Sequence, residues 1–289
     1  MEQVRTCRDK VNKLFLGGGG IQIENNNDVK TFYEEVDEDG RVGWELLEYV
    51  RSKEIISRYI DDTIMEIADI SGGTGAYSFW LAGMGHRVHL LDLAQKHIDI
   101  AKARSKDINI PLASCSCSDA RSIPYDDQSM DLVLLMGALY HLKSDESRIQ
   151  CLTEAFRVLK PGRLAICTVM SRYNGLIAAF TWDLVDSFGG MDALKNALET
   201  GSTSVAGPKM PLFYSHTPSG IITEMSVAGF KDIHLIAVEG IASAIGDKRN
   251  ILPEDKKSAM QLLKAIEMTE SVPDILGISR NIIAVGKKV

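Results

Sequence analysis

The sequence has no apolar run near the roughly 20 residues that a membrane-spanning helix needs. Residues 1–16 mix charged with apolar side chains and lack the apolar core of a secretory signal. Basic residues form no cluster, and 39 acidic against 32 basic side chains give a formal net charge of −7. Nucleic acids and anionic membrane surfaces attract clustered positive charge. We therefore expect a cytoplasmic protein with no nucleic-acid and no membrane partner.

Cysteine is scarce, with five residues at Cys7, Cys115, Cys117, Cys151 and Cys167. An odd count without regular spacing favours free thiols in a reducing compartment. Cys115 and Cys117 form a C-x-C pair that could in principle hold a soft metal. On a strand, however, their side chains share one face, where buried thiols act as small apolar groups. This structural interpretation is favoured, so no metal site is expected.

From residue 63 onward, short apolar segments alternate with amphipathic ones. Nearly all-apolar strands separated by helices are what a parallel sheet buried on both faces requires. The pattern predicts a doubly wound α/β fold with a mostly parallel, seven-stranded sheet. The predicted strands cover residues 64–70, 87–91, 112–117, 132–136, 164–170, 233–238 and 281–285. The predicted helices between and after them cover residues 77–84, 98–105, 147–159, 218–228 and 254–268.

Two segments fall outside this alternation. Residues 1–60 predict an N-terminal helical region or lid, which leaves 61–289 as the core. Residues 171–215, approximately, predict a helical cap inserted into that core. Aromatic residues of the cap could line a pocket for a small, partly apolar acceptor, or could simply pack between cap and sheet. These aromatic residues are Phe180, Trp182, Phe188, Phe213 and Tyr214.

The strongest local motif is D-I-S-G-G-T-G, from Asp69 to Gly75, at the end of the first predicted strand. Glycines there let the backbone bend sharply and approach a ligand, because no Cβ stands in the way. The following helix would present its unpaired N–H groups and positive dipole end to that ligand. The motif therefore predicts a cofactor at the end of the first strand.

The glycine spacing bears on which cofactor binds. A dinucleotide site uses G-x-G-x-x-G, whose third glycine allows close packing of helix on strand. With Gly73 and Gly75 as the first two, the third would be position 78, which is Ser78. The dinucleotide match fails there, although a nicotinamide-dependent oxidoreductase stays an open alternative.

Two further carboxylates follow the next strands. Asp92 ends the second strand, where it could accept hydrogen bonds from a ribose, or could cap the next helix. Asp119, within Ser118-Asp119-Ala120, follows the third strand, where it could accept from an adenine amine or again cap a helix. Together these positions favour a nucleoside ligand without choosing between cofactors.

A family resemblance appears when the motifs are taken in order. After Asp69–Gly75, Asp92 and Ser118–Ala120 come D-L-V-L-L-M-G-A-L-Y-H from Asp131 to His141 and R-V-L-K-P-G from Arg157 to Gly162. Over about residues 60–170, this series resembles class I S-adenosylmethionine-dependent methyltransferases. Looser matches elsewhere in the chain resemble a small-molecule branch of that family. The resemblance implies a Rossmann-like methyltransferase fold and S-adenosyl-L-methionine as cofactor.

The resemblance also implies a role for individual residues. The methionine part of the cofactor would be surrounded by Asp69, Ser71, Gly73 and Gly75, with Ser71 standing where glycine is commoner. The nucleoside would contact Asp92, Leu93, Asp119 and Ala120. The sulfonium would lie beside Met136 and Gly137, with Tyr33 and Glu48 closing over the cofactor.

Methyl transfer needs chiefly the alignment of nucleophile, methyl and leaving sulfur. A base is needed only when solvent cannot take the proton of the methyl acceptor. His141 is the first candidate for a catalytic residue that takes this proton or orients the acceptor, followed by Tyr140 and His216. Each could instead be structural, by capping, packing or lid closure. The expected partner is a small-molecule acceptor whose methylated atom is undetermined, and a homodimer is possible.

Two other functions stay open besides the oxidoreductase. A non-catalytic protein could retain the nucleoside pocket and bind S-adenosylmethionine without transferring its methyl group. An arsenite methyltransferase is suggested by the C-x-C pair, but that chemistry needs more thiols around one atom. Methyl transfer to a small molecule is therefore the favoured prediction.

Overall fold

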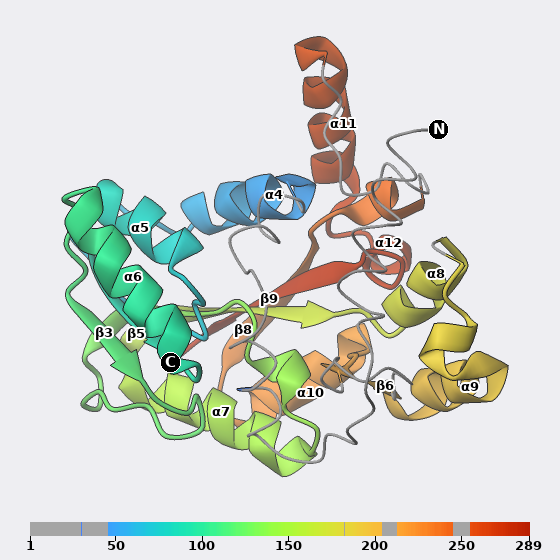
Figure 1. Cartoon of the computed structure of the whole chain (residues 1–289), viewed down its shortest axis with the longest axis horizontal. Coiled ribbons are helices and arrows are strands. Elements are labelled where there is room, and N and C mark those ends of the chain that lie inside the picture. The colour runs from blue at the N-terminus through green and yellow to red at the C-terminus, as the bar shows by residue number, and fades with distance from the viewer. Residues whose placement is uncertain (1–29, 31–45, 182, 204–212, 245–254) are drawn as a thin grey trace.

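The structure is a computed structural model that describes residues 30, 46–181, 183–203, 213–244 and 255–289. Its centre is a single seven-stranded sheet in the order β3-β2-β1-β4-β5-β9-β8. Figure 1 shows this sheet between α4, α5 and α6 on one side and α7 and α10 on the other. The predicted doubly wound α/β fold is therefore confirmed.

The sheet is mostly parallel. Strands β1 to β5 pair in parallel, and β9 pairs antiparallel with both β5 and β8. The carboxyl ends of the parallel strands consequently lie at one edge of the sheet, where open α/β folds bind ligands. The strands are β1 (Glu66–Ile70), β2 (Arg87–Asp92), β3 (Ser114–Cys117), β4 (Met130–Leu135), β5 (Leu159–Met170), β8 (Lys231–Ala237) and β9 (Asn281–Lys287).

Helices connect these strands and cover both faces. In the cap segment, residues 171–215, two helices are followed by β6 (Ser202–Thr203) and β7 (Phe213–Tyr214), which pair antiparallel. The longer helices are α4 (Leu46–Ser57), α5 (Ala76–Gly83), α6 (Gln95–Asp107), α7 (Asp145–Val158), α8 (Asn174–Thr181), α9 (Gly190–Thr200), α10 (Pro218–Val227) and α11 (Lys256–Thr269). Shorter ones are η1 (Leu139–His141), η2 (Asp186–Phe188), η3 (Gly240–Ala244) and α12 (Pro273–Leu276).

Strand β4 shows why the apolar runs form a central sheet. All six of its residues are buried, and alternate side chains enter different cores. Val133 and Leu135 join the core shared with α7 and α10, whereas Leu132 and Leu134 join the one shared with α4 and α5. Burying one such side chain stabilises the fold by about 1.5–3 kcal/mol. A strand with no polar face is stable only when helices cover both sides.

Several elements start at other residues than the sequence predicted, among them β5 and β3. β5 begins at Leu159, five residues earlier than predicted, because Leu159 pairs with Met130 before a register shift. The Pro161–Gly162 pair, expected only to stop the preceding helix, lies within this strand, and Gly162 takes a positive φ of 80°. β3 starts at Ser114 rather than at residue 112. Both differences arise from pairing with a neighbouring strand, which local sequence does not encode.

Helices α10 and α7 begin with side-chain caps. The Thr217 side chain accepts from the Gly220 N–H at 3.0 Å, and Pro218 occupies the first turn of α10. The Ser144 side chain accepts from the Ser147 N–H at the start of α7. These contacts satisfy backbone donors that have no partner within the helix.

None of the helices in the described part of the chain is both long and apolar enough to cross a membrane.

Candidate functional site

The turn after β1 adopts left-handed backbone conformations at three positions. Ser71 has φ 60°, Gly73 has φ 58° and Gly75, which precedes α5, has φ 91°. The Gly75 N–H donates to the Gly72 carbonyl at 3.0 Å and closes the bend. Glycine takes such angles without a steric penalty, whereas Ser71 does so at a cost of roughly 1–2 kcal/mol. The first residue of this turn is therefore a site of local strain.

Gly72 is needed for space rather than for its backbone angle. A Cβ at this position would lie 2.5 Å from Leu90 Cδ1 and 2.6 Å from Asp69 Oδ2. Neither neighbour can move easily, because both side chains are completely buried. The sequence motif showed four clustered small residues. Only the packing of Leu90 and Asp69 around position 72 explains why that residue must be glycine.

Asp69 carries a buried carboxylate that the protein satisfies on one side only. Ser78 Oγ donates to Asp69 Oδ2 at 2.6 Å, whereas Asp69 Oδ1 has no hydrogen-bond partner among the described residues. Burial raises the pKa of this carboxyl to about 6, and the nearby Asp92 adds to that effect. Ser78 stands at the position where the dinucleotide pattern failed, and its hydroxyl serves this carboxylate. A cationic group beside Asp69 Oδ1 would satisfy the remaining oxygen.

Asp92 connects the end of β2 to the glycine turn. Its Oδ2 accepts from the Gly73 N–H at 2.9 Å, and its Oδ1 accepts from the Ala94 N–H at 2.8 Å. His97 Nδ1 lies 3.1 Å from Oδ1. An ionised carboxylate has about four acceptor positions, so these contacts leave one position on Oδ2 for a ligand hydroxyl. The turn-forming role and the predicted ribose role can therefore coexist at Asp92.

The predicted adenine side is arranged around a local ion pair. Arg121 donates to both oxygens of Asp119, with Nε 3.0 Å from Oδ1 and Nη2 2.7 Å from Oδ2. The Ser118 N–H donates to the Asp92 carbonyl at 3.0 Å, which places the two strand ends side by side. Ala120 is buried and Leu93 is half-buried. An adenine amine at Asp119 would have to share this carboxylate with Arg121.

The end of β4 approaches the glycine turn. A Cβ built on Gly137 would lie 3.2 Å from Tyr140 Oη and 3.6 Å from the Ser71 carbonyl oxygen. Met136, the preceding residue, accepts a weak hydrogen bond at Sδ from Thr168 Oγ1 at 3.5 Å. The predicted sulfonium-side residues therefore lie beside the predicted methionine-side turn, although more than 60 residues separate them in the sequence.

Tyr140 and His141 form an aromatic cluster with the cap. Their ring centroids are 4.5 Å apart, and Phe213 from β7 lies 5.9 Å from Tyr140 and 5.3 Å from His141. The short helix η1 carries the two residues directly after β4, so the cluster borders Gly137. Two of the three predicted catalytic side chains are thus brought together next to the turn.

His216 lies in a different, fully buried cluster. Its Nε2 is 3.0 Å from Glu224 Oε2, and its ring centroid is 4.7 Å from that of Tyr214. Arg148 Nε donates to Glu224 Oε1 at 2.9 Å, and its guanidinium carbon lies 3.4 Å from the Tyr214 ring centroid. Burial is the main reason that the pKa of His216 is lowered. The structure thus separates His216 from the other two candidates.

The N-terminal region contributes a contact that the sequence did not indicate. Tyr49 Oη donates to the Ala76 carbonyl at 3.3 Å, and the Tyr49 and Tyr77 ring centroids are 5.4 Å apart. Helix α4 is thereby fixed beside the first turn of α5, next to the glycine motif. Glu48 is half-buried on the same helix. The predictions for Tyr33 and Trp182 lie outside the described residues.

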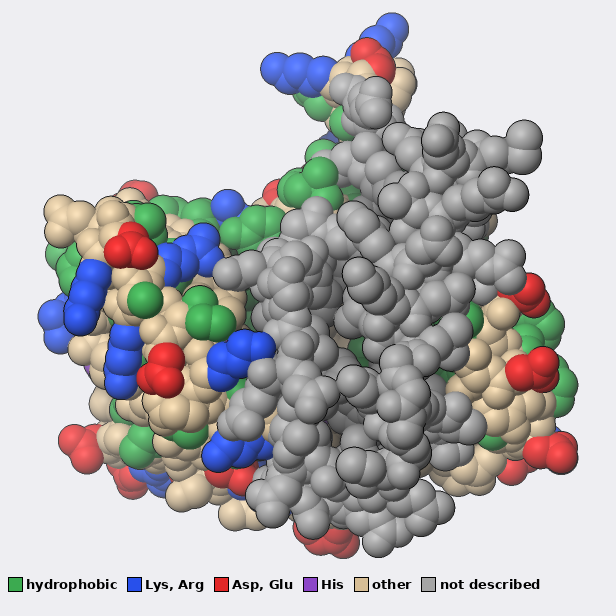
Figure 2. Space-filling model, in the orientation of Figure 1, with side chains coloured by type: hydrophobic (Ala, Val, Ile, Leu, Met, Phe, Trp, Pro, Cys, Tyr) green, Lys and Arg blue, Asp and Glu red, His purple; other side chains and the backbone are tan. Residues whose placement is uncertain are grey.

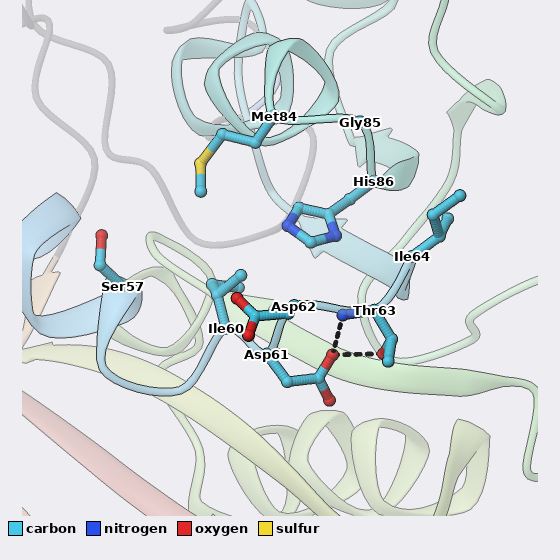
Figure 3. Close-up of a pocket in the computed structure, with 9 residues that line it drawn as sticks. All are labelled: Ser57, Ile60, Asp61, Asp62, Thr63, Ile64, Met84, Gly85 and His86. Atoms are coloured by element: carbon cyan, nitrogen blue, oxygen red, sulfur yellow. Dashed lines mark hydrogen bonds between the residues drawn. The ribbon is translucent and has the colours of Figure 1, made fainter.

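A cavity of about 400 Å³ lies away from this site. It is lined by residues preceding β1 and β2, including Asp61, Asp62 and His86 (Figure 3). The Asp61 carboxylate already accepts two hydrogen bonds, from the backbone N–H and from the hydroxyl of Thr63. Since the cavity borders the amino ends of the parallel strands, it lies at the edge opposite the glycine turn.

The cysteine pair is only partly buried. Cys115 packs in a small apolar cluster with α6, whereas Cys117 is exposed and its Sγ donates to the Leu93 carbonyl at 3.4 Å. Burial raises the pKa of the Cys115 thiol. Within the described residues, no three His, Cys, Asp or Glu side chains gather as metal ligands would.

Comparison with known proteins agrees with this geometry. Residues 68–167, from within β1 to within β5, match the family described as a methyltransferase domain. The chain carries an S-adenosylmethionine-dependent methyltransferase domain. The matched residues include the glycine turn, Asp92, Asp119 and the Met136–His141 stretch.

Relatives of this domain extend the comparison. The demethylmenaquinone methyltransferase of Lactococcus lactis is 31% identical over 115 residues, covering 39% of this chain and 44% of that protein. A probable tRNA methyltransferase 9B of Bos taurus is 31% identical over 98 residues, covering 33% of this chain and 19% of that protein. The chain thus spans less than half the length of these curated relatives. The similarity therefore covers only part of this chain and part of each relative.

Solved structures share the fold over a longer stretch. A protein of Methanosarcina mazei described as an S-adenosylmethionine-dependent methyltransferase superposes with a TM-score of 0.57 at 16% identity. The match covers 81% of this chain and 97% of that one. At this identity the likeness concerns the fold alone, and it extends beyond the methyltransferase domain.

Proposed function

We propose that this protein transfers a methyl group from S-adenosylmethionine to a small-molecule acceptor. One observation carries the proposal: two buried carboxylates flank the glycine turn, and each keeps an acceptor position open. Among the described residues, Asp69 Oδ1 has no partner, and Asp92 Oδ2 accepts only from Gly73. A ligand that fits both must present a cation and a hydroxyl close together, as S-adenosylmethionine does with its ammonium and ribose groups.

The residues around the turn would hold the two ends of the cofactor. Asp69, Ser71, Gly73 and Gly75 would bind the methionine part, and the N-terminus of α5 would face its carboxylate. Asp92, Leu93, Asp119 and Ala120 would bind the nucleoside. When bound, S-adenosylmethionine supplies a methyl group made electrophilic by its positively charged sulfur. Met136 and Gly137 would border that group, while Tyr33 and Glu48 would close the site from the N-terminal region.

The acceptor would bind where the cap meets the end of β4. Tyr140, His141 and Phe213 offer aromatic surface beside Gly137, which suits a small, partly apolar molecule. We assign Tyr140 and His141 to orienting this acceptor, and the cap segment to covering it. Positioning of this kind can lower the barrier by several kcal/mol, because the reacting atoms are aligned before reaction.

A small molecule is favoured over a nucleic acid as acceptor. On the face in Figure 2, Lys and Arg side chains over α5 and α6 stand among acidic and apolar ones and form no uninterrupted basic stripe. The relative named as a tRNA methyltransferase matches only 33% of this chain and 19% of its own length, so it carries little weight for the acceptor. A cytoplasmic location and a homodimer stay predictions from the sequence.

Cofactor binding is tested by calorimetry with S-adenosylmethionine and, separately, NAD. We expect S-adenosylmethionine to bind and to stabilise the fold by about 2.7 kcal/mol at one hundred times its dissociation constant. Gly73→Val should abolish this binding. Gly85→Val is the matched control, because Gly85 also has a positive φ of 97° but no atom within 4 Å of a Cβ there. Equal binding by both variants, or tighter binding of NAD, would contradict the assignment.

Catalysis is tested by release of S-adenosylhomocysteine in the presence of an acceptor library that includes phenols, amines, quinols and tRNA. His141→Ala should lower turnover more than cofactor affinity, and Tyr140→Phe should raise the KM of the acceptor. Cofactor binding without product from any acceptor would indicate a non-catalytic binding protein. Turnover with tRNA alone would contradict the small-molecule assignment.

A further inference from the structure

The buried cluster around His216 adjoins the carboxyl end of β5. His216 forms a parallel bridge with Ser171, and its N–H donates to the Met170 carbonyl at 2.8 Å. The His216 carbonyl in turn accepts from the Arg172 N–H at 2.8 Å. Since residues opposite each other in a bridge point their side chains to the same face, the side chains of Ser171 and His216 lie side by side. They extend β5 at the same edge of the sheet as the glycine turn.

Three polar atoms near this bridge are buried and have no hydrogen-bond partner in the described part of the chain. They are Ser171 Oγ, His216 Nδ1 and Asn174 Oδ1. Asn174 belongs to the same turn, because its N–H donates to the Ser171 carbonyl at 3.0 Å. A buried polar atom without a partner costs about 1–3 kcal/mol. Ser171 and Asn174 are close in the sequence, and His216 pairs with Ser171 across the bridge. Three unpartnered polar atoms at one place are more than the fold itself explains.

The hydrogen-bond partners of His216 fix which of its nitrogens carries the proton. Arg148 can only donate, and its Nε donates to Glu224 Oε1 at 2.9 Å. The ionised Glu224 can only accept, so the His216 Nε2 that lies 3.0 Å from Oε2 must carry a hydrogen. Burial favours the neutral ring by lowering the pKa of His216. His216 Nδ1 is therefore a lone-pair acceptor, and Glu224 is a positioning residue.

Arg148 and Arg172, the two guanidinium groups beside His216, already donate to other acceptors. Arg148 also donates to the carbonyls of Leu142 and Lys143, at 2.9 and 2.7 Å. Arg172 donates from Nε to the Ser215 carbonyl at 2.8 Å and from Nη1 to two carbonyls of α9. The open atoms are thus two acceptors and one hydroxyl. Such a set is satisfied by a neutral group that donates a hydrogen bond, and it repels a carboxylate or phosphate.

We infer that Ser171, Asn174 and His216 form a subsite that binds a hydroxyl or amine group of the methyl acceptor. The inference rests on the proposed function and narrows its substrate class to acceptors with a neutral hydrogen-bond donor. His216 Nδ1 and Asn174 Oδ1 accept from that group, and Ser171 Oγ completes its coordination. Glu224 and Arg148 act through His216 by holding its ring and its tautomer.

The test follows His216 itself by nuclear magnetic resonance of the full chain labelled with ¹⁵N-histidine. Phenol, anisole and benzoate are titrated separately, with and without S-adenosylhomocysteine. The three probes are similar in size, but only phenol donates a hydrogen bond. We expect phenol to shift the Nδ1 resonance of His216 and the other two to leave it unchanged. A His216→Gln variant, whose spectrum lacks this resonance, provides the assignment.

Two variants separate recognition from packing. In Glu224→Gln, Arg148 holds the amide oxygen, so the amide NH₂ faces His216 Nε2 and drives the proton to Nδ1. This variant should raise the dissociation constant of phenol about tenfold, the loss expected for one hydrogen bond. Ser171→Ala should do the same without changing the tautomer, which the ¹⁵N shifts of His216 report directly. Ser219→Ala, an exposed change next to the cluster, is the control.

The outcomes distinguish this inference from the proposed function. A shift by anisole equal to that by phenol, or no shift by phenol in either state, would mean that the subsite holds only water. Unchanged phenol binding in Glu224→Gln would contradict the tautomer argument. Calorimetry with S-adenosylmethionine tests the proposed function independently, since the cofactor residues lie outside this cluster. Loss of the phenol response with intact cofactor binding refutes the subsite alone.

Discussion

At the scale of single residues, the Asp69 carboxyl is expected to affect both the stability of the fold and the binding of a cationic ligand. Its completely buried carboxylate has a pKa of about 6, against an ordinary value of 3.8, chiefly because burial removes it from water. The folded chain therefore holds this proton more tightly than the unfolded chain does. The contribution of Asp69 to stability is therefore highest below pH 3.8 and declines as the pH rises to about 6, by roughly 3 kcal/mol for such a shift. A bound cation offsets this loss.

Asp69→Asn should separate the two effects. Without cofactor at pH 7, the variant should be more stable than the native chain by up to about 3 kcal/mol, because no buried charge remains. Its affinity for S-adenosylmethionine should fall at least tenfold, because the ammonium loses its carboxylate. Thermal unfolding and calorimetry measure the two quantities. The exposed Asp107→Asn serves as control and should change neither; a destabilised Asp69→Asn would argue against the desolvation account.

The same carboxyl predicts how cofactor affinity depends on pH. With a pKa of about 6, Asp69 is mostly ionised at pH 7 but only about one tenth ionised at pH 5. Because the ammonium pairs with the ionised form, the dissociation constant should rise about tenfold between these values. Calorimetry across pH 5–7.5 measures this slope. The slope should flatten in Asp69→Asn, and an equally steep slope in that variant would assign it to another group.

At the scale of elements, the cap depends on one arginine. Arg172 follows β5 and donates to Ser215 beside β7 and to the Leu198 and Glu199 carbonyls in the last turn of α9. A cation at a helix C-terminus satisfies unpaired carbonyls and complements the helix dipole. Gly201 lets the chain pass, since a Cβ there would lie 2.7 Å from both Arg172 Nη2 and the Ser215 carbonyl oxygen. The cap is therefore attached to the sheet through backbone carbonyls.

Arg172→Ala should loosen the cap without unfolding the sheet. Losing charge-assisted bonds to three carbonyls should lower the local stability of α9 and β7 by about 1.5–3 kcal/mol. Hydrogen exchange followed by mass spectrometry should show faster exchange in these elements and unchanged exchange in β1 and β4. Arg87→Ala, which removes an exposed pair with Glu66, is the control. Uniformly faster exchange throughout the sheet would show that Arg172 supports the whole fold.

At the scale of the whole molecule, an ion cluster joins an early helix to the carboxyl-terminal part of the chain. Glu270, directly after α11, contacts Arg51 Nη2 of α4 at 2.5 Å and Nη1 of Arg58, the residue that follows α4, at 2.6 Å. Arg51 is almost fully buried and also donates to the Val238 carbonyl. Burial acts to raise the pKa of Glu270, but the hydrogen bonds from Arg58 and Arg51 outweigh it and leave the pKa lowered. The pairing holds α4 next to the glycine turn.

Glu270→Ala should destabilise the whole protein by about 1.5–3 kcal/mol, because Arg51 and Arg58 lose a shared carboxylate and keep only Glu54. Urea unfolding measures this loss. Since the pKa of Glu270 is lowered on folding, its contribution is present above the unfolded value of 4.5 and is lost as the pH falls below it. Glu267→Ala, which breaks an exposed pair with Lys264, should cost under about 1 kcal/mol. Equal losses in both variants would contradict a role for burial.

The sequence was sufficient where a signal is local and continuous. The apolar runs predicted the strands, because strands buried on both faces are nearly all apolar, as β4 is from Leu132 to Leu135. The seven glycine-turn residues predicted a ligand site because left-handed angles restrict which residues are possible there. Asp92 was placed correctly at the end of β2, since parallel strands end at one edge.

Other features arise only from contacts between distant segments. The early start of β5 depends on pairing with Met130, and the Gly72 constraint depends on Leu90 and Asp69. His141 ranked ahead of His216 as a catalytic candidate, but only the structure shows that His141 contacts the rings of Tyr140 and Phe213, whereas His216 pairs with Glu224. No local pattern records which face a side chain will meet.

The sequence by itself therefore determined the α/β alternation, the cofactor turn and the order of motifs, because backbone sterics and hydrophobic periodicity act over neighbouring residues. Tertiary structure alone decided which polar atoms are left without partners. Such atoms are Asp69 Oδ1, the open position on Asp92 and the three atoms near His216. They stay open because no donor or acceptor of the described residues lies within hydrogen-bond distance. That depends on packing among β1, β2, β5, α7 and α10, since a buried group is satisfied or left open only by the elements folded around it.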